Sequence, residues 1–309
     1  MSTTLRIATR GSELALWQAH HIRDALLAAH PGLAVELVVV TTEGDRIQDR
    51  PLHEIGGKGL FVKGIEERLL AGDAELAVHS MKDLPAEMIP ELVVAATPER
   101  VDPRDVLIGP AGLGLADLRA GMRVGTGSLR RAALVARENP AVTVAPLRGN
   151  VPTRLRKVEQ GELDAVILAA AGLVRLGLAD RITEWISPER FCPSPTQGIL
   201  ALQCRTADAR TRELIAVLDH APTAARAEAE RSFLRRLQAG CSVPMGCFAE
   251  EVGGGQMRVT GLVIGAGGRP YFRAGRVGAV EDAATLGVAV AETLLEMGAD
   301  VVLAAASGG

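Results

Sequence analysis

The densest group of chemically versatile side chains is His79-Ser80-Met81-Lys82-Asp83, shortly before Pro85. The apolar run Leu76-Ala77-Val78 just ahead of it predicts the end of a buried strand. In open α/β sheets, ligands bind where the carboxyl ends of the strands meet. The cation of Lys82 favours an ionised Asp83 carboxylate. The segment is therefore either a ligand-binding turn or an ordinary surface turn with a solvated Lys–Asp pair.

Other cationic and hydroxyl side chains also follow expected strands or open expected helices. They are Arg10, Ser12, Lys58, Lys82, Thr126, Ser128, Arg130, Arg131, Arg148, Arg154 and Arg175. Arginine binds carboxylates and phosphates through two parallel hydrogen bonds. Arg130 and Arg131 open an expected helix, where cations oppose the helix dipole. This favours a polyanionic ligand, with Asp83 as its single opposed carboxylate, over a solvated helix face.

Two glycine-rich segments add candidates. Gly56-Gly57-Lys58-Gly59 precedes an expected helix, so its N–H groups could bind an anion, although a simple flexible loop is the common alternative. Cys241 follows Gly240 in a second segment and is a candidate nucleophile or covalent anchor. Most lone cysteines are inert small hydrophobic residues instead. A Cys–His protease is not supported, because no histidine lies near Cys241 in the sequence.

Charge is unevenly distributed along the 309 residues. The net charge is −3, but residues 121–181 contain ten basic and five acidic side chains. This local charge of +5 leaves −8 for the remainder and indicates an anionic ligand held locally. Nucleic acid is a poor candidate, because only eight aromatic residues are available for base stacking and no nucleic-acid motif is present.

Cysteine use and hydropathy indicate the compartment. The four cysteines show no CxxC spacing, so neither a zinc site nor a disulfide scaffold is expected. No apolar run reaches the roughly 18 residues of a membrane span. The first residues lack a basic segment followed by an apolar one, so no secretory signal is expected. These features predict a soluble, cytoplasmic protein with no metal and no membrane partner.

The order of elements predicts two similar α/β domains facing a shared cleft. Each begins with a strand, a Gly-Ser turn and a helix, at Thr9 to Ser12 and at Gly125 to Ser128. Residues 72–78 and 161–167 then share a pattern of glycine, acidic residues and an apolar strand, although chance similarity among α/β units is the alternative. Strands near 248–251, 257–264 and 271–277 and a helix near 283–297 predict a small third α+β domain.

Several segments together resemble the porphobilinogen deaminases, or hydroxymethylbilane synthases, of tetrapyrrole and haem biosynthesis. The segments that carry the resemblance are residues 7–12 (IATRGS), 56–61 (GGKGLF), 78–83 (VHSMKD), 127–131 (GSLRR), 147–150 (LRGN) and 240–244 (GCSVP). Several such segments in the same order are far more specific than any one of them. The resemblance covers nearly the whole chain and becomes loose beyond Gly253.

The resemblance implies a fold of two periplasmic-binding-protein-like domains around a cleft and a small C-terminal domain. Domain 1 would comprise residues 1–98 and 198–217, domain 2 residues 99–197, and domain 3 residues 218–309. It also implies a transferase that adds four porphobilinogen molecules, with loss of ammonia, to a covalent dipyrromethane primer. Hydrolysis would then release the linear tetrapyrrole. The enzymes it resembles need no metal, and a monomer is expected.

The resemblance also assigns roles to residues. Asp83 matches the catalytic aspartate, and Cys241 matches the cysteine that holds the cofactor through a thioether. The positions that match cofactor-binding or substrate-binding residues are Arg10, Ser12, Lys58, Ser80, Lys82, Thr126, Ser128, Arg130, Arg131, Arg148, Arg154, Arg175 and Gln197. Two positions depart from the pattern: Gly127 stands where many relatives have serine, and Ala239 replaces a common glycine.

Two rival classes remain. One is a non-enzymatic anion-binding protein of two domains, against which the absent signal peptide and Cys241 both count. The other is a phosphoryl-transfer enzyme that uses the Gly-Ser turns, but the sequence has no P-loop and no clear pair of Mg²⁺-binding carboxylates. The mass of the intact protein separates all three, because only the deaminase requires a covalent adduct.

Overall fold

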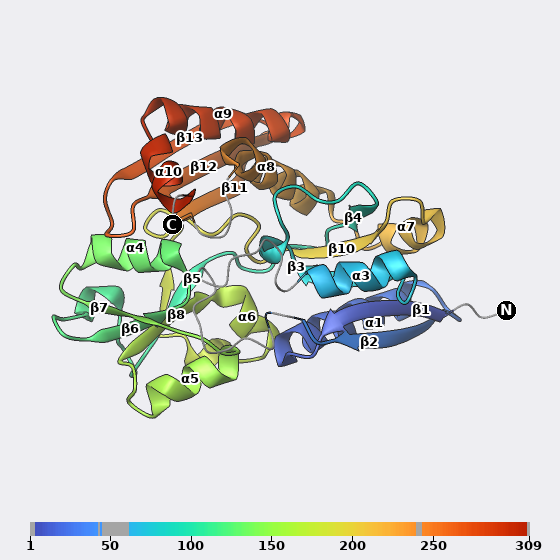
Figure 1. The fold of residues 1–309 in the computed structure, drawn as a ribbon, viewed down its shortest axis with the longest axis horizontal. Coiled ribbons are helices and arrows are strands. Elements are labelled where there is room, and N and C mark those ends of the chain that lie inside the picture. The colour runs from blue at the N-terminus through green and yellow to red at the C-terminus, as the bar shows by residue number, and fades with distance from the viewer. Residues whose placement is uncertain (1–3, 43, 45–61, 239–242, 308–309) are drawn as a thin grey trace. The chain divides into compact units, whose positions relative to one another are not determined.

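The computed structural model describes residues 4–42, 44, 62–238 and 243–307. The chain forms two compact units (Figure 1). The first comprises Met1–Arg50, Gly56–Val101 and Gly198–Ala224. The second comprises Asp102–Gln197 and Ala225–Gly309. The chain therefore leaves the first unit after Val101 and returns to it at Gly198.

The first unit contains a five-stranded sheet in the order β2-β1-β3-β10-β4. Strands β1, β2 and β3 are parallel, and β10 is antiparallel to both of its neighbours. The strands are β1 (Thr4–Arg10), β2 (Ala34–Val40), β3 (Leu76–Ser80), β4 (Leu92–Ala96) and β10 (Leu200–Arg205). The helices are α1 (Glu13–Ala29), α3 (Lys63–Ala71), α7 (Ala209–Ala216) and the 3-10 helix η1 (Met81–Asp83).

Both faces of this sheet are covered by helices. Successive side chains of a strand point to opposite faces. Ile7 of β1 packs in a core with α1, whereas the next residue, Ala8, packs in another core with α3. A strand buried on both faces has a continuous apolar run rather than an alternating one. This explains the run Leu76-Ala77-Val78, and it leaves the carboxyl end of β3 as the place where polar residues begin.

The second unit contains a sheet with the same plan, in the order β7-β6-β8-β5-β9. Strands β7, β6 and β8 are parallel, and β5 runs antiparallel to β8 and β9. The strands are β5 (Asp105–Ile108), β6 (Arg123–Thr126), β7 (Thr143–Pro146), β8 (Ala165–Ala169) and β9 (Glu184–Ile186). The helices are α4 (Leu129–Glu138), α5 (Val151–Glu159), α6 (Ala170–Arg175) and the 3-10 helices η2 (Leu115–Asp117) and η3 (Ala179–Arg181).

The C-terminal part of the second unit is a three-stranded antiparallel sheet with helices. Its elements are α8 (Ala221–Leu237), which begins in the first unit and enters the second at Ala225, β11 (Met245–Gly253), β12 (Gln256–Ile264), β13 (Tyr271–Ala279), η4 (Val280–Asp282), α9 (Ala283–Glu296) and α10 (Asp300–Ser307). Phe233 of α8 and Val290 of α9 lie in its core. Leu262 and Ile264 of β12 pack instead with Leu134 of α4, so this sheet shares a core with the preceding α/β domain.

The predicted α/β class, with two similar domains and a small C-terminal α+β domain, is confirmed. The internal similarity extends to single hydrogen bonds. The N–H of Arg6 in β1 donates to Glu75 at 2.8 Å, and the N–H of Arg123 in β6 donates to Asp164 at 2.7 Å. Each acidic residue lies just before the third parallel strand of its own sheet. The predicted domain boundaries after residues 98, 197 and 217 stay predictions.

The sequence analysis did not predict β4, β5, β9 or α10. The strands β4, β5 and β9 are short and lie on the antiparallel side of their sheets. Of these strands, β5 bears most directly on the candidate site, since it opens with the buried Asp105.

Candidate functional site

The polar turn after β3 holds Asp83 at the carboxyl end of the strand. Met81 is buried, and its N–H donates to the carbonyl of Ile199 at 2.9 Å. The N–H of Leu84 closes the short 3-10 helix on the carbonyl of Met81 at 3.1 Å. Lys82 is half-buried, and Asp83 is exposed. The backbone of the turn is therefore fixed from inside while its carboxylate faces outward.

Other predicted residues of the first unit lie at the same edge of the sheet. Arg10 ends β1 and Ser80 ends β3, and these two strands are parallel neighbours. The hydroxyl of Ser12 caps α1 by accepting from the N–H of Ala15 at 3.4 Å. Ser80 Oγ accepts from Gln18 Nε2 of α1 at 3.1 Å. The fold thus brings Arg10, Ser12, Ser80, Lys82 and Asp83 to one edge, as the strand-end argument predicted.

A buried histidine supports this edge from within the sheet. His79 Nε2 is 2.9 Å from Gln203 Oε1 of β10, and Gln203 Nε2 donates to Glu66 of α3 at 2.8 Å. Burial, together with the nearby charge of Arg10, lowers the pKa of His79 to about 4, although the hydrogen bond to Gln203 opposes this shift. His79 is therefore neutral near pH 7, and its hydrogen bond to Gln203 links β3 to β10.

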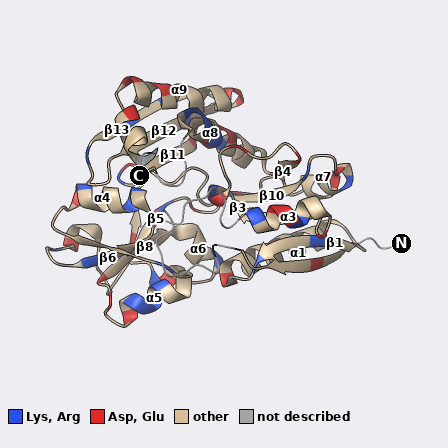
Figure 2. Ribbon diagram, in the orientation of Figure 1, with Lys and Arg blue, Asp and Glu red and all other residues tan. Residues whose placement is uncertain are grey.

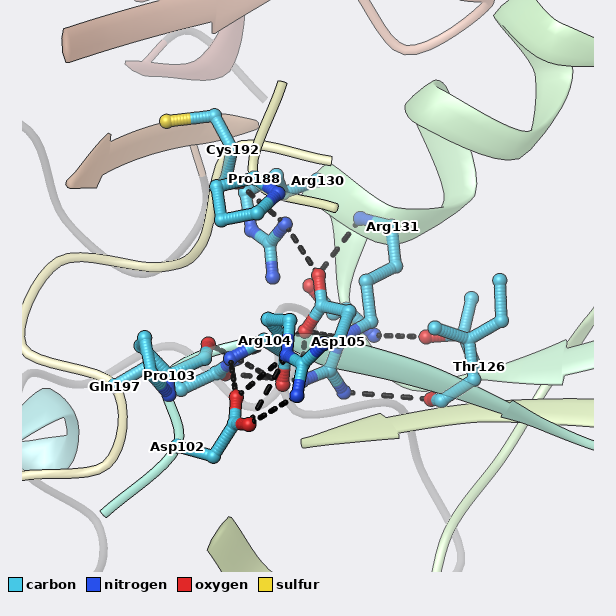
Figure 3. Close-up of polar contacts among 12 residues, drawn as sticks. Asp102, Pro103, Arg104, Asp105, Thr126, Arg130, Arg131, Pro188, Cys192 and Gln197 are labelled. Atoms are coloured by element: carbon cyan, nitrogen blue, oxygen red, sulfur yellow. Dashed lines mark hydrogen bonds and ion pairs between the residues drawn. The ribbon is translucent and has the colours of Figure 1, made fainter. Parts of the chain in front are cut away.

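In the second unit, Arg130 and Arg131 of α4 converge on Asp105 of β5 (Figure 3). Arg130 Nη1 lies 2.7 Å from Asp105 Oδ2, and Arg131 Nε donates to Asp105 Oδ1 at 2.9 Å. All three side chains are buried, with residue exposures of 4%, 6% and 0%. Burial alone would raise the pKa of Asp105, but the two arginine charges outweigh it and hold the pKa well below its usual range.

This geometry rules out one interpretation and corrects another. Arg130 and Arg131 are not a solvated helix face, because both are buried. Asp83 is not the single carboxylate opposed to the cations, because Asp105 faces both arginines of α4. The sequence signal that could have revealed Asp105 is a charged residue opening the apolar run Val106-Leu107-Ile108. A buried carboxylate needs a cation or hydrogen-bond donors beside it to offset its lost hydration.

The remaining described candidates of the second unit follow its three parallel strands. Thr126 ends β6, and Ser128 caps α4 by accepting from the N–H of Arg131 at 3.4 Å. Arg148 lies shortly after β7, and Arg154 lies on the basic helix α5 (Figure 2), where its Nε donates to the carbonyl of Gly149 at 2.8 Å. Arg175 ends α6, which directly follows β8. Burial lowers the pKa of Arg175 to about 10.

Gln197 completes the group around the arginine pair. Its Oε1 accepts from Arg131 Nη2 at 3.0 Å, and its Nε2 donates to Asp105 Oδ1 at 2.9 Å. The fold therefore joins Gln197 to residues far away in sequence. Two predicted residues, Lys58 and Cys241, lie outside the described residues. The other cysteines are buried, and burial raises the pKa of the Cys192 thiol to about 12 and that of the Cys204 thiol to about 11.

Comparison with known proteins identifies the family. Residues 5–213 match the family model of the porphobilinogen deaminase dipyromethane cofactor binding domain, and residues 224–296 match that of the porphobilinogen deaminase C-terminal domain. A porphobilinogen deaminase from Syntrophotalea carbinolica is 49% identical over 304 residues, which are 98% of this chain and 96% of that protein. The chain belongs to the porphobilinogen deaminase family.

Two solved structures are distantly similar to this chain. The periplasmic VFT2 domain of Bordetella pertussis BvgS is 16% identical, with a TM-score of 0.40 over 69% of this chain and 85% of that one. The amino-acid ABC transporter binding protein YtmK of Bacillus subtilis is 11% identical, with a TM-score of 0.40 over 71% of this chain and 90% of that one. Similarity at this level does not bear on the site.

The residues present fit the cofactor that the family uses. Arg130 Nε and Nη2 are buried and have no hydrogen-bond partner among the described residues. Buried guanidinium donors need acceptors, and a dipyrromethane with acetate and propionate groups supplies carboxylate oxygens. Within the described ranges, no group of three or more histidine, cysteine or acidic side chains could hold a metal ion. In the same ranges, no helix combines the length and apolar character needed to cross a membrane.

Proposed function

We propose that this chain is a porphobilinogen deaminase, or hydroxymethylbilane synthase, that joins four porphobilinogen molecules head to tail. Each round releases one ammonia, forms one carbon–carbon bond and removes one proton from a pyrrole α-carbon. Hydrolysis then frees the linear tetrapyrrole hydroxymethylbilane. The observation that carries the proposal is the 49% identity to a porphobilinogen deaminase over 98% of the chain. We further propose a cytoplasmic monomer without nucleic-acid or membrane partners.

The catalytic group in this proposal is Asp83. Loss of ammonia from porphobilinogen leaves a cation shared with the pyrrole nitrogen, and a carboxylate near that N–H stabilises it. Asp83 is suited to this role because it is exposed at a strand end whose backbone is fixed by Met81 and Leu84. A preorganised charge of this kind contributes roughly 3–4 kcal/mol of transition-state stabilisation.

The cationic residues hold the carboxylates of the growing chain. Arg130 and Arg131 would bind the dipyrromethane, whose free α-position is where substrate units are added. Arg148 lies in a separate segment and would act mainly during elongation. The remaining proposed cofactor-binding and substrate-binding residues are Arg10, Ser12, Lys58, Ser80, Lys82, Thr126, Ser128, Arg154, Arg175 and Gln197.

Cys241 is proposed as the only covalent anchor, through a thioether to the dipyrromethane. The buried, high-pKa thiols of Cys192 and Cys204 support this choice, because a thiol reacts as its thiolate. Cys247 is also buried.

The mass of the purified, intact protein tests the proposal. We expect an adduct of two pyrrole units on the peptide that contains Cys241, together with consumption of porphobilinogen. Cys241→Ser should abolish both, whereas Cys247→Ser, the nearest matched control, should retain both. An unmodified protein that is fully active would refute the anchor, and a modified protein that leaves porphobilinogen unchanged would refute the reaction.

A further inference from the structure

A buried carboxylate outside the proposed site connects the C-terminal domain to the segment that precedes Gln197. Glu230 of α8 is 0% exposed. Its Oε2 accepts from the N–H of Thr196 at 2.5 Å, and its Oε1 accepts from the N–H of Ala249 in β11 at 2.8 Å. One carboxylate therefore binds two backbone N–H groups, one from each of two segments far apart in sequence.

Thr196 has a backbone conformation that requires such support. Its φ is +59°, in the left-handed region that β-branched residues rarely adopt. A residue of this kind keeps that conformation only when its surroundings hold it. Thr196 is 2% exposed, and besides the bond to Glu230 its hydroxyl donates to the carbonyl of Pro195 at 2.7 Å.

The conformation of Thr196 determines where the next side chain points. Gln197 accepts from Arg131 at 3.0 Å and donates to Asp105 and to the carbonyl of Pro103, the latter at 2.7 Å (Figure 3). A guanidinium is planar, so Asp105 and Gln197 together fix both the position and the plane of Arg131. A rotation of the backbone at Thr196 would remove Gln197 from this arrangement.

We propose that Glu230 is a positioning residue for the arginine pair. By binding the N–H of Thr196, it fixes the backbone turn that directs Gln197 onto Arg131 and Asp105. The proposal rests on the proposed function in one respect, namely that Arg131 binds the cofactor. In this proposal, helix α8 helps to arrange the second α/β domain and also packs in the core of the C-terminal domain.

Glu230→Gln tests the proposal. The glutamine amide has only one acceptor oxygen, so it cannot accept from the N–H groups of both Thr196 and Ala249 as the two carboxylate oxygens do. The direct readout is the hydrogen-exchange rate of the Arg131 Nε–H, measured by NMR. The resonance is assigned by its disappearance from the spectrum of Arg131→Lys. We expect exchange to become about tenfold faster or more as the arrangement opens locally. We also expect a smaller fraction of protein carrying the cofactor by intact mass.

Glu228→Gln is the matched control. Glu228 lies on the same helix and binds Ser232 and Arg235, with a side chain that is 48% exposed. Both exchange and cofactor content should stay at the wild-type level in this variant. A folded Glu230→Gln protein with wild-type exchange at Arg131 would overturn the proposal, whatever its thermal stability.

A second measurement covers the case in which Glu230→Gln does not fold. In the wild-type protein, the hydrogen bonds of the Thr196 N–H and the Arg131 Nε–H should break in the same local opening. The equilibrium constants for opening, obtained from hydrogen exchange, should therefore agree within about threefold. A difference of more than about tenfold would show that they are not coupled and would overturn the proposal. These exchange rates do not depend on turnover, so a protein inactive toward porphobilinogen would refute the function and not the positioning role.

Discussion

Asp83 and Asp105 are carboxylates of two similar α/β domains, and the fold places them in opposite environments. Asp83 follows the third parallel strand of its sheet and is exposed. Asp105 opens an antiparallel strand and is buried between Arg130 and Arg131. An exposed carboxylate at a strand end is available to a substrate, whereas a buried one between two guanidinium groups fixes their orientation.

The two domains also show that the shared framework does not determine the charge it carries. Ser12 and Ser128 cap the first helices of the two domains in the same way. The next turn contains the acidic Glu13 in one domain and the arginine pair in the other. The fold supplies equivalent positions, and the residue types at those positions decide whether the first turn of the helix carries a negative or a positive charge.

The largest effect should follow from breaking the buried pair. Asp105→Asn leaves two buried guanidinium groups without their counter-charge, so the free energy of unfolding should fall by about 3–5 kcal/mol. Glu159→Gln breaks an exposed pair with Arg181 and should cost about 1 kcal/mol or less. Denaturant unfolding at pH 7 measures both. Equal losses for the two variants would contradict the role assigned to burial.

Asp83→Asn should show the opposite pattern, in which activity is lost and stability is kept. We expect kcat to fall by about 10²–10³, because the amide cannot stabilise a pyrrolic cation as a carboxylate does. Asp73→Asn, which replaces another exposed carboxylate of the same unit, should leave kcat near the wild-type value. Steady-state kinetics with circular dichroism test this, and near-normal turnover by a folded Asp83→Asn protein would remove Asp83 from the mechanism.

The buried His79 predicts a pH dependence of stability. Its pKa is about 4 in the folded protein, below the ordinary value of 6.5, so the unfolded chain binds its proton more readily. The stabilisation is therefore complete above about pH 6.5 and is lost as pH falls toward 4, by up to about 3 kcal/mol. Unfolding free energies at pH 7 and pH 4.5 measure this loss. His79→Asn should show a much smaller difference between the two pH values, and an equal difference would assign the loss to other groups.

The smallest effect concerns the Gly-Ser turns of the two domains. A Cβ added at Gly127 would lie 2.6 Å from the carbonyl oxygen of Leu147, whereas one added at Gly11 would lie 3.4 Å from a methyl group of Val39. Gly127→Ala should therefore destabilise the protein by about 1–3 kcal/mol, and Gly11→Ala by less. Thermal unfolding compares the two. If Gly127→Ala costs no more than Gly11→Ala, the close contact with Leu147 does not explain why residue 127 is a glycine.

Much of the framework could be predicted because its signals are local. The apolar run before Ser80 places the end of β3, and Ser128 caps α4 by binding an N–H three residues ahead. The family segments, including the one around Asp83, could likewise be read from the sequence. These features depend only on residues within a few positions of one another, so the sequence alone is enough to predict them.

The tertiary structure alone decided which residues meet. Asp105 and Arg131 are 26 positions apart, and the bond from Gln203 to His79 spans 124. Whether a charge is buried depends on the sheet and helices packed around it, so sequence patterns could not separate a solvated helix face from a buried ion pair at Arg130 and Arg131. The sequence determined where charged groups follow strands and helix caps, and packing determined which of them became paired and buried.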